Sequence, residues 1–547
     1  MNKSVVFVSD FFLENGVLGG AEYYNDNLIN YLSRKFSVEK INSQLVGVDF
    51  IKKNIDSKFI IANFMTLPEK SKKFIAENVD YCIVEHDHKY TKTNNPSLFK
   101  NFLIPEDLII NKEFFRSAKA VFCQSKLHAE VLQKNLLIKN ICNLGGNIWT
   151  DAQLDILQKN IDNKKDIEHG IIETSNKNKG MPKSIQFCMD NKLKYELLPL
   201  QQFDKFVENL SRVKKLVFFP QWLESYSRLA IEARILNCKL VTNSLLGVAS
   251  EPYFKMKGQK LLDFIRSNNK NLYKKYESFL NNEKIEFIRP VSLPKVTILG
   301  TFYKGEKHIE GFLKNIVKQT TFDNCELILI NANSPENEEK IILKYVNKYD
   351  NIIYKKLDYR AKTSECFNIG IGMSTGDFLT FGLIDDRRSK NYLETMSKHL
   401  HFNPDVDLVY GDCLQTDIDN EVFENNSSNG SIYEHSIAQF SKQNMIKCLP
   451  GPMPLWRKNM HEKAGVFNTN HDFADDWEMW LKAIDNGSKF KKIARNIYPV
   501  GLYLKGGRSQ DTVNIPQRKE EALLFNKYKD IFGDEVVKSF EPYFNQF

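Results

Sequence analysis

Short apolar runs alternate along the chain with longer segments in which apolar residues recur every three or four positions. The first run, SVVFVSDF at 4–11, has the length and composition of a buried strand, and Ala21, Tyr24 and Leu28 then share one face of a helix. Three further strand-like runs follow in the same region: FIIANFM, YCIVEHD and AVFCQS. Strands that alternate with helices are typical of α/β layers, so residues 1–160 are predicted to form one Rossmann-like lobe.

A second, smaller set of parallel strands is predicted for residues 161–290. Its runs are SIQFC, YELLPL, KLVFFP and KLVTNS. A third lobe is predicted for residues 291–547, where the strand KVTILGTF precedes an amphipathic helix. The runs ELILINANS, NIIYKKL, DFLTFGLIDD and DLVYGD supply its further strands. The predicted fold class is therefore α/β, with a pair of Rossmann-like lobes followed by a third α/β domain.

Composition narrows the class of protein but not its chemistry. With 547 residues, of which 42% are hydrophobic and 26% charged, the chain is expected to fold into several lobes. Its apolar runs are shorter than the ~18 to 20 residues of a membrane span, and its start resembles no signal peptide, so a cytoplasmic location is predicted. A cytoplasmic protein of this kind can still contact a membrane surface from the outside of the bilayer. The nine cysteines are scattered singly, which favours reduced thiols, and the net charge of +8 permits a polyanionic partner without requiring one.

The segment LVFFPQWLESYSRLAIEARILNCKLVTN places two carboxylates, Glu224 and Glu232, in a predicted strand, loop and helix. Open α/β sheets bind ligands beyond the carboxyl ends of their strands. The two acids can therefore accept hydrogen bonds from sugar hydroxyls, one on a hexose and one on a ribose. In the alternative interpretation, Glu224 complements the helix dipole and Glu232 pairs with an arginine on the surface.

The same segment resembles the E-x7-E region of glycosyltransferase family 4, whose members have a GT-B fold. Four other stretches agree with this family in order: GGAE, AVFCQSKLHAEVL, KG and LVTNSLLGVASEPYF. The resemblance implies that Glu224 contacts the donor sugar, Glu232 the nucleotide ribose and Lys179 the diphosphate. It also implies that Gly19 and Gly20 let backbone N–H groups approach the donor, and that transfer retains configuration without a metal ion.

A dense polar cluster, VEHDHKY, follows the strand-like run YCIV. His86 and His88 are predicted to contact an acceptor, because imidazole can donate or accept a proton near neutral pH. Adjacent residues of an extended chain point to opposite faces, so a single metal ion cannot easily collect this cluster. Hydrogen bonds that stabilise a loop are the alternative role.

In the third lobe, the apolar run DFLTFGLI ends abruptly in Asp385 and Asp386. Two carboxylates at the end of a strand can form an oxygen site for Mg²⁺ or Mn²⁺, and such an ion can hold a nucleoside diphosphate. The alternative is a solvated turn next to Arg387 and Arg388.

A second acidic group, Asp475 and Asp476, stands just before an amphipathic helix. An acid there can cap the helix or act as a base toward an acceptor hydroxyl. Between the two acidic groups lies the loop CLPGPMPLWRKNMHEKAGVF, in which Trp456 is predicted to offer an apolar platform to the acceptor.

These motifs, in this order, resemble glycosyltransferase family 2, the inverting enzymes of GT-A fold. The resemblance covers nearly all of the segment 294–509, and residues 507–509 of it lie outside the part that the structure describes. It implies that Asp385 binds the metal ion with Asp386 beside it, that Asp476 is the general base, and that Asp475 is the first acid of the motif. Asn368 and Asn331 take donor-binding positions. NANS replaces the usual DDGS-type turn, and LID replaces a full DxD.

The sequence therefore predicts a bifunctional glycosyltransferase with a GT-B-like pair of lobes and a GT-A-like nucleotide-sugar-binding domain. The donor is a nucleotide sugar, the second module uses Mn²⁺ or Mg²⁺, and the acceptor is a glycan or a lipid-linked glycan. One alternative acceptor is the hydroxymethylated bases of bacteriophage DNA. In another alternative, one module binds sugars without catalysis. The first strand is not followed by GxGxxG, which disfavours a dehydrogenase.

Overall fold

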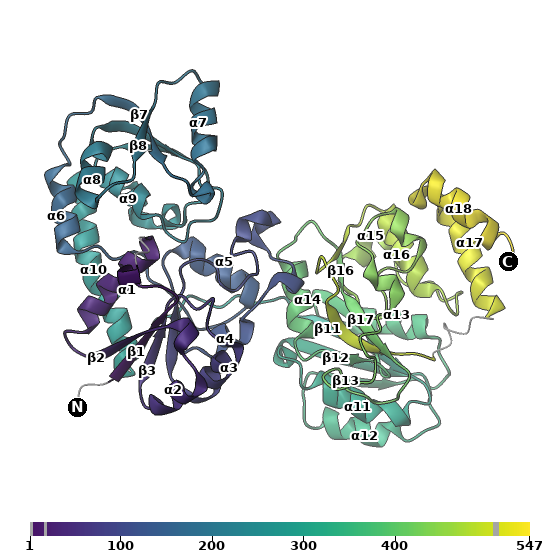
Figure 1. The fold of residues 1–547 in the computed structure, drawn as a ribbon. Helices are drawn as coiled ribbons and strands as arrows, with labels where there is room; N and C mark the ends of the chain where they lie inside the picture. The colour runs from purple at the N-terminus through teal and green to yellow at the C-terminus, as the bar shows by residue number, and fades with distance from the viewer. Residues whose placement is uncertain (1–3, 16–18, 507–513) are drawn as a thin grey trace. The chain divides into compact units, whose positions relative to one another are not determined.

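The computed structural model describes residues 4–15, 19–506 and 514–547, and the chain divides into two compact units (Figure 1). Unit 1 comprises Met1–Ile104 and Leu108–Val291, and unit 2 comprises Pro105–Asp107 and Ser292–Phe547. The boundary after Val291 lies one residue from the predicted one between 290 and 291. Both units are α/β, in agreement with the predicted class.

The first lobe of unit 1 is a six-stranded parallel sheet with strand order β2-β1-β3-β4-β5-β6. The strands are β1 (Ser4–Ser9), β2 (Ser37–Asn42), β3 (Lys58–Ile61), β4 (Tyr81–Val84), β5 (Ala120–Cys123) and β6 (Ile141–Asn143). Its helices are α1 (Gly20–Leu32), α2 (Val48–Lys53), α3 (Glu69–Asn78), α4 (Lys112–Ser117) and α5 (Lys126–Leu136). The central strands β1, β3, β4 and β5 are almost entirely buried, as expected of a parallel sheet covered by helices on both faces.

The second lobe of unit 1 has a four-stranded parallel sheet with order β10-β9-β7-β8. The strands are β7 (Ile167–Glu173), β8 (Glu196–Pro199), β9 (Val213–Phe218) and β10 (Lys239–Thr242). Its helices are α6 (Asp151–Lys159), α7 (Met181–Asp190), α8 (Phe203–Ser211), α9 (Arg228–Ile235) and α10 (Gly258–Asn281).

One predicted strand of this lobe is wrong. The run SIQFC lies inside helix α7, and the strand of that region is IEHGIIE, which forms β7. Pro182 stands in the first turn of α7, where its fixed backbone favours a helix start. Short apolar runs fit a buried helix as well as a strand, so periodicity alone could not separate the two.

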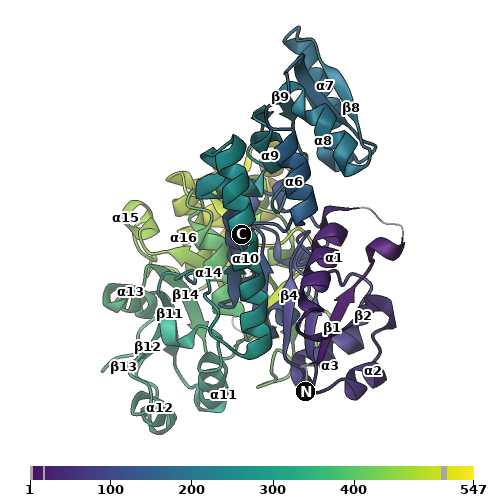
Figure 2. The same cartoon turned by 90° about the vertical axis from the view of Figure 1, so that its left-hand side faces the viewer.

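Helix α10 belongs to both lobes of unit 1 (Figure 2). Leu261, Leu262 and Ile265 in its first half pack into the core of the second lobe. Tyr276, in its second half, packs into the core of the first lobe, where its hydroxyl lies 2.6 Å from that of Tyr24. A continuous helix shared by two cores couples the lobes into one folding unit.

Unit 2 is built on a seven-stranded mixed sheet with order β13-β12-β11-β14-β18-β16-β19, and a small sheet with order β15-β20-β17 lies apart from it. The strands of the large sheet are β11 (Val296–Phe302), β12 (Cys325–Asn331), β13 (Ile352–Lys356), β14 (Phe378–Leu383), β16 (Leu408–Tyr410), β18 (Leu455–Arg457) and β19 (Phe490–Lys492). Those of the small sheet are β15 (Arg387–Arg388), β17 (Asp412–Thr416) and β20 (Pro499–Leu504). The parallel strands β11 to β14 bring their carboxyl ends to one edge of the large sheet.

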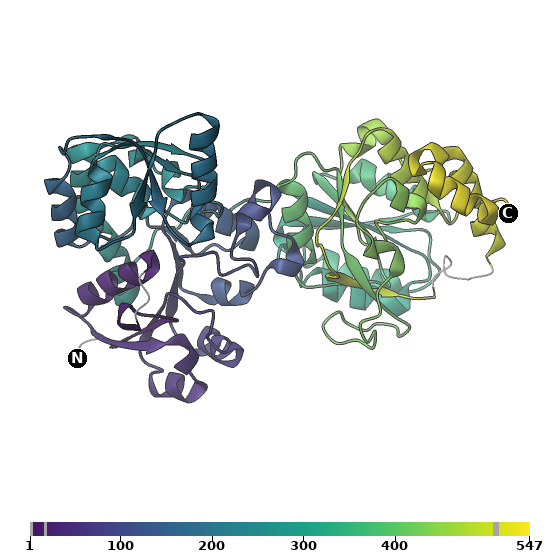
Figure 3. The ribbon, with the colours of Figure 1, turned by 45° about the horizontal axis from the view of Figure 1, so that its top comes forward.

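Helices cover the sheet of unit 2 and extend it at the C-terminal end. They are α11 (Glu306–Ile316), α12 (Glu338–Val346), α13 (Thr363–Met373), α14 (Tyr392–His401), α15 (Met460–Ala464), α16 (Asp475–Asp485), α17 (Ile515–Phe532) and α18 (Asp534–Phe544). The last two, yellow in Figures 1 and 3, share one apolar core with α16, in which the rings of Trp477 and Phe532 stack 6.3 Å apart. Among the described residues, the helices that the structure contains are too short or too polar to cross a bilayer.

Candidate active site

A cleft of unit 2 has a volume of about 1390 Å³ and opens at the carboxyl ends of β11 and β14. Thr301, Tyr303 and Asp385 line it from these strand ends, and the first turn of α16 lines it from another side. Helices α17 and α18 contribute a further wall. A volume of this size exceeds that of a typical small-molecule pocket and leaves room for two ligands side by side.

The structure separates the two acids that follow strand β14. Asp385 lines the cleft, whereas Asp386 is 1% exposed and is not among the lining residues. Oδ1 of Asp386 accepts a hydrogen bond from the backbone N–H of Leu504 at 3.3 Å, and its Oδ2 has no partner within the described residues. Burial, followed by the charge of Asp385, raises the pKa of Asp386 well above its usual range. The predicted role of Asp386 as a metal ligand does not agree with this position. Strand β14 ends at Leu383, and the turn that follows leaves Asp385 at the cleft and carries Asp386 into the interior beside β20.

The remaining carboxylate, Asp385, fits one mode of metal binding. Mg²⁺ is commonly held by one or two carboxylates together with the phosphates of a substrate. Within the described ranges, no group of three or more His, Cys, Asp or Glu side chains could hold an ion by itself. The donor set of this cleft thus fits an ion that a diphosphate helps to bind, with Asp385 as the protein ligand.

Asp475 and Asp476 form the first turn of α16 and both line the cleft. The backbone N–H of Trp477 donates to Oδ1 of Asp476 at 2.7 Å, and the thiol of Cys448 donates to its Oδ2 at 3.5 Å. Burial, then the charge of Asp476, raises the pKa of Asp475 to about 7, and burial also raises the pKa of Asp476. A carboxylate with a raised pKa is a stronger base, which is what removing a proton from a hydroxyl requires.

Three other residues predicted for this site have structural roles instead. Trp456 is fully buried in β18, where its indole N–H donates to Nε2 of His461 at 3.0 Å, so it offers no platform to an acceptor. Asn331 is also buried, and its Oδ1 accepts from the N–H of Ser334 at 2.7 Å, which closes the turn after β12. Asn368 binds both the N–H and the C=O of Phe467. Only the partner of Asn368 lies far away in the sequence, 99 residues on, and no local pattern could reveal it.

The sequence analysis did not single out one feature of the cleft, the pair Tyr303 and Arg360. Both line the cleft, and the Arg360 guanidinium lies 4.2 Å from the centroid of the Tyr303 ring. A tyrosine ring at the end of a parallel strand, next to a cation, can stack on a nucleobase. The signal was available in the run ILGTFYKG, where an aromatic residue follows the buried part of a strand.

In unit 1, the structure brings together two residues that lie 45 positions apart. Nζ of Lys179 lies 2.9 Å and 3.1 Å from the two carboxylate oxygens of Glu224. Gly180 makes this approach possible: its φ is +68°, and a Cβ there would lie 1.8 Å from the carbonyl oxygen of Phe219. The loop that carries Glu224 also contacts the first lobe, because Oγ of Ser125 donates to the carbonyl of Ser225 at 2.6 Å. Lys179 and Glu224 are therefore close to the junction of the two lobes.

Of the other residues predicted for unit 1, Glu232 is buried, whereas Gly19 is half-buried and Gly20 is exposed. Glu232 is 5% exposed, and its Oε1 accepts from the indole N–H of Trp149 at 3.0 Å and lies 3.5 Å from Nε of Arg228. Gly19 is the residue before α1 and Gly20 is its first residue.

The two histidines predicted to contact an acceptor are buried. Nε2 of His86 lies 3.0 Å from Oδ1 of Asn25, and Nε2 of His88 lies 3.3 Å from the carbonyl oxygen of Leu223. Burial lowers the pKa of His86 to about 3 and that of His88 to about 4. Both side chains are thus neutral near pH 7. His86 bonds within the first lobe and His88 bonds to the second, so the structure offers neither to an acceptor.

Comparison with known proteins identifies one region of unit 2. Residues 297–465 match the model of the family described as Glycosyl transferase family 2. This confirms, for that region, the resemblance that its motifs indicated. The matched segment contains Tyr303, Arg360 and Asp385, and it ends ten residues before Asp475.

Two curated relatives are similar over short stretches. The chain is 28% identical over 119 residues to the minor teichoic acid biosynthesis protein GgaB of Bacillus subtilis, which is 21% of this chain and 13% of that protein. It is 24% identical over 153 residues to the glycosyltransferase GlyA of Streptococcus pneumoniae, which is 26% of this chain and 22% of that protein. Among solved structures, that of S. aureus TarS 1-349 with UDP is similar with a TM-score of 0.36 and 16% identity, over 45% of this chain and 72% of that one.

Proposed function

We propose that unit 2 is an inverting glycosyltransferase that moves a sugar from a nucleotide sugar to a hydroxyl group of a glycan. The observation that carries this proposal is the convergence of Asp385, Tyr303 and the Asp475–Asp476 pair on one cleft. Such a transfer needs three groups from the protein: a ring that stacks on the nucleobase, a ligand for the metal ion and a carboxylate that accepts a proton. The match of residues 297–465 to family 2 supports the same reaction class.

In the proposed reaction, Asp476 accepts the proton of the acceptor hydroxyl as its oxygen bonds to the anomeric carbon of the donor. The bond from that carbon to the diphosphate breaks, and its electron pair leaves with the nucleoside diphosphate. Asp385 would hold a divalent ion, which supplies positive charge to the departing phosphates. Arg360, Lys304 and Lys362 also line the cleft and add positive charge on its donor side.

The acceptor is proposed to lie between α16 and the two C-terminal helices. Tyr543, Phe540, Arg518 and Gln517 line this wall of the cleft. Aromatic rings can pack against the apolar face of a sugar, while guanidinium and amide groups bind its hydroxyls. A glycan or lipid-linked glycan acceptor fits this combination of side chains.

For unit 1 we propose a second transferase module that retains configuration and needs no metal ion. The pairing of Lys179 with Glu224 near the junction of the two lobes supports it. A lysine there can bind a diphosphate, after which Glu224 is released to accept hydrogen bonds from a sugar. Because Glu232 is already bound to Trp149, a module that binds sugars without transferring them is the second candidate.

A thermal-shift screen of nucleotide sugars, with and without Mn²⁺, tests both modules. We expect one response that requires Mn²⁺ and is lost in Asp385→Asn, and one that does not require Mn²⁺ and is lost in Glu224→Gln. Glu173→Gln, at the exposed end of β7, is the control for the second variant. Stabilisation by no nucleotide sugar would contradict the proposal for both units. A response that both active-site variants keep would remove the site assignments.

A further inference from the structure

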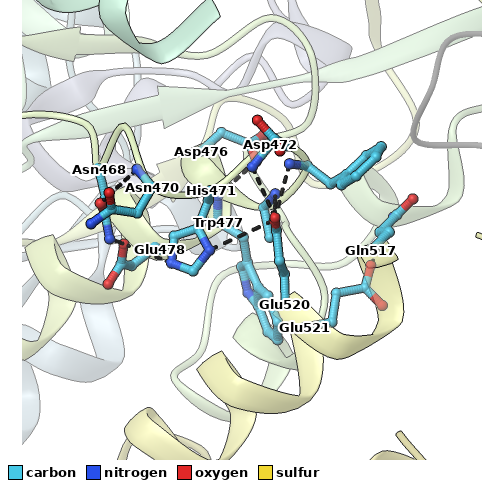
Figure 4. A network of polar contacts seen from close by, with 12 residues as sticks. Asn468, Asn470, His471, Asp472, Asp476, Trp477, Glu478, Gln517, Glu520 and Glu521 are labelled. Carbon is cyan, nitrogen blue, oxygen red and sulfur yellow. Dashed lines mark hydrogen bonds and ion pairs between the residues drawn. The ribbon is translucent and has the colours of Figure 1, made fainter. Parts of the chain in front are cut away.

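Helix α17 holds the loop that precedes the acidic pair through a single carboxylate, Glu520. Its Oε1 accepts from the backbone N–H of Asp472 at 2.9 Å. Its Oε2 accepts from the N–H groups of Phe473 at 3.0 Å and Ala474 at 3.1 Å. Figure 4 shows Glu520 pointing from α17 toward this loop. One side chain thus fixes three consecutive peptide units directly ahead of Asp475.

The physical setting makes these hydrogen bonds strong. The three N–H groups precede the first turn of α16, where backbone donors have no partner inside the helix and carry partial positive charge. Ala474, the residue before the helix, has a methyl side chain that cannot accept a hydrogen bond. Glu520 therefore replaces a local cap with a charged one from another helix, and hydrogen bonds to an ionised acceptor are about twice as strong as neutral ones.

A second set of contacts from the same helix fixes the other side of the first turn. Nζ of Lys527 lies 2.7 Å from Oε1 of Glu478, and Oε2 of Glu478 accepts from Nδ2 of Asn468 at 2.7 Å. His471 lies between the two acids, 3.3 Å from Glu478 and 3.7 Å from Glu520 (Figure 4). Helix α17 thus binds the end of the loop of residues 468–474 directly, through Glu520, and its start indirectly, through Lys527 and Glu478.

We propose that Glu520 is the positioning residue that presents Asp475 and Asp476 to the cleft, so that the transferase module extends through α17, past the region that matches the family model. This inference rests on the proposed function of unit 2. Glu520 does not line the cleft, so it acts through the loop and not on the substrate. Its carboxylate sets where the acids stand, and its negative charge adds to the field that they experience.

The charge of Glu520 has a predictable direction. It raises the pKa of Asp475, after the larger effects of burial and of Asp476. The other titratable or charged groups around the pair are His471 and Asp472 in the loop, Glu478 in α16, Arg518 and Glu521 in α17, Tyr433, Glu434, His435, Lys447 and Cys448 in the segment 433–448, and Lys362, which pairs with Asp472 at 2.8 Å. Removing the charge of Glu520 makes the pair less basic, so the pH at which activity appears should fall.

The test compares Glu520→Ala and Glu520→Gln with Glu541→Gln, which removes the same charge from an exposed position of α18. Hydrogen exchange of the full-length protein reports the amides of residues 472–474 without any substrate. Hydrolysis of the nucleotide sugar that gives the largest Mn²⁺-dependent thermal shift reports kcat, KM and the pH profile.

We expect Glu520→Ala to lose protection of these amides and to lower kcat by about 10- to 100-fold with little change in the KM of the donor. Glu520→Gln, which keeps one acceptor oxygen, should recover part of the rate and move the acid limb of the pH profile down by roughly half a unit. Glu541→Gln should match the parent protein.

Unchanged kcat and pH profile in Glu520→Ala, together with lost amide protection, would overturn the positioning role. Retained protection of these amides in Glu520→Ala would show that the hydrogen bonds to Glu520 do not hold the loop. If Glu520→Ala loses protection of these amides but the parent protein hydrolyses no nucleotide sugar, the role of Glu520 in holding the loop is supported and the proposed function of unit 2 is contradicted.

Discussion

The thiol of Cys448 donates a hydrogen bond to Oδ2 of Asp476 across 3.5 Å. A donor to an ionised carboxylate favours the charged form, so this contact lowers the pKa of Asp476 and partly offsets the effect of burial. The loop that contains Cys448 thereby tunes the residue that we propose as the general base.

Replacing Cys448 with alanine should therefore make Asp476 harder to ionise. Because the base acts in its ionised form, the acid limb of the activity profile should move to higher pH, by roughly half a unit. Cys448→Ser keeps a donor and should stay close to the parent protein. The measurement is the pH dependence of kcat/KM, and a limb that moves to lower pH in Cys448→Ala would contradict this account of the contact.

The two acids after β14 should respond differently to the same change. Asp385→Asn removes the ligand in the cleft and should weaken the Mn²⁺-dependent binding of a nucleoside diphosphate by about tenfold or more. Asp386→Asn should keep that binding, because Asp386 is buried, has a raised pKa and does not line the cleft. Calorimetric titration with and without Mn²⁺ separates the two variants. Equal losses in both would restore Asp386 as a ligand.

Tyr303 and Arg360 are expected to bind the nucleobase. Stacking of a base on an aromatic ring is worth about 1 to 3 kcal/mol, so Tyr303→Ala should raise the Kd of the nucleotide by roughly 5- to 150-fold. Tyr303→Phe should keep most of the affinity. Tyr359→Ala is the matched control, since that tyrosine is 44% exposed and lies outside the cleft lining. A Tyr303→Ala variant with the parent affinity would place the base elsewhere.

Trp456 should matter for stability and not for the acceptor. It packs against Phe381 and Trp480, with ring centroids at 4.9 Å and 5.2 Å. Trp456→Phe should lower the free energy of unfolding by about 1 to 3 kcal/mol in a urea titration. At a temperature where the variant is folded, its KM for an acceptor should equal that of the parent protein. A raised KM without a loss of stability would bring back the surface role.

The sequence predicted those parts of the cleft that depend on local pattern. Asp385 follows a strand that is almost wholly apolar, and Asp476 lies in the first turn of an amphipathic helix. The predicted ends of these two elements therefore located both acids. The α/β class followed from the same alternation. The burial of Asp386 did not follow from the same pattern, because a turn separates it from β14 and its hydrogen bond comes from Leu504 in β20.

Long-range contacts explain what the sequence could not predict. Trp456 is an interior residue because α16 covers its strand, and no local signal distinguishes a covered tryptophan from an exposed one. Glu520 lies 46 residues after Ala474, and its role exists only because α17 packs beside α16. The prediction for the run SIQFC failed for a different reason, because a run of five residues with two large apolar side chains fits a helix as well as a strand.

The most direct test of the central claim is the release of nucleoside diphosphate from the nucleotide sugar that stabilises the protein most in the presence of Mn²⁺. The account predicts that Asp476→Asn lowers the rate of release by about 10²- to 10⁴-fold while the thermal shift caused by the donor stays the same. Release at the parent rate by Asp476→Asn would contradict the assignment of the base in this cleft.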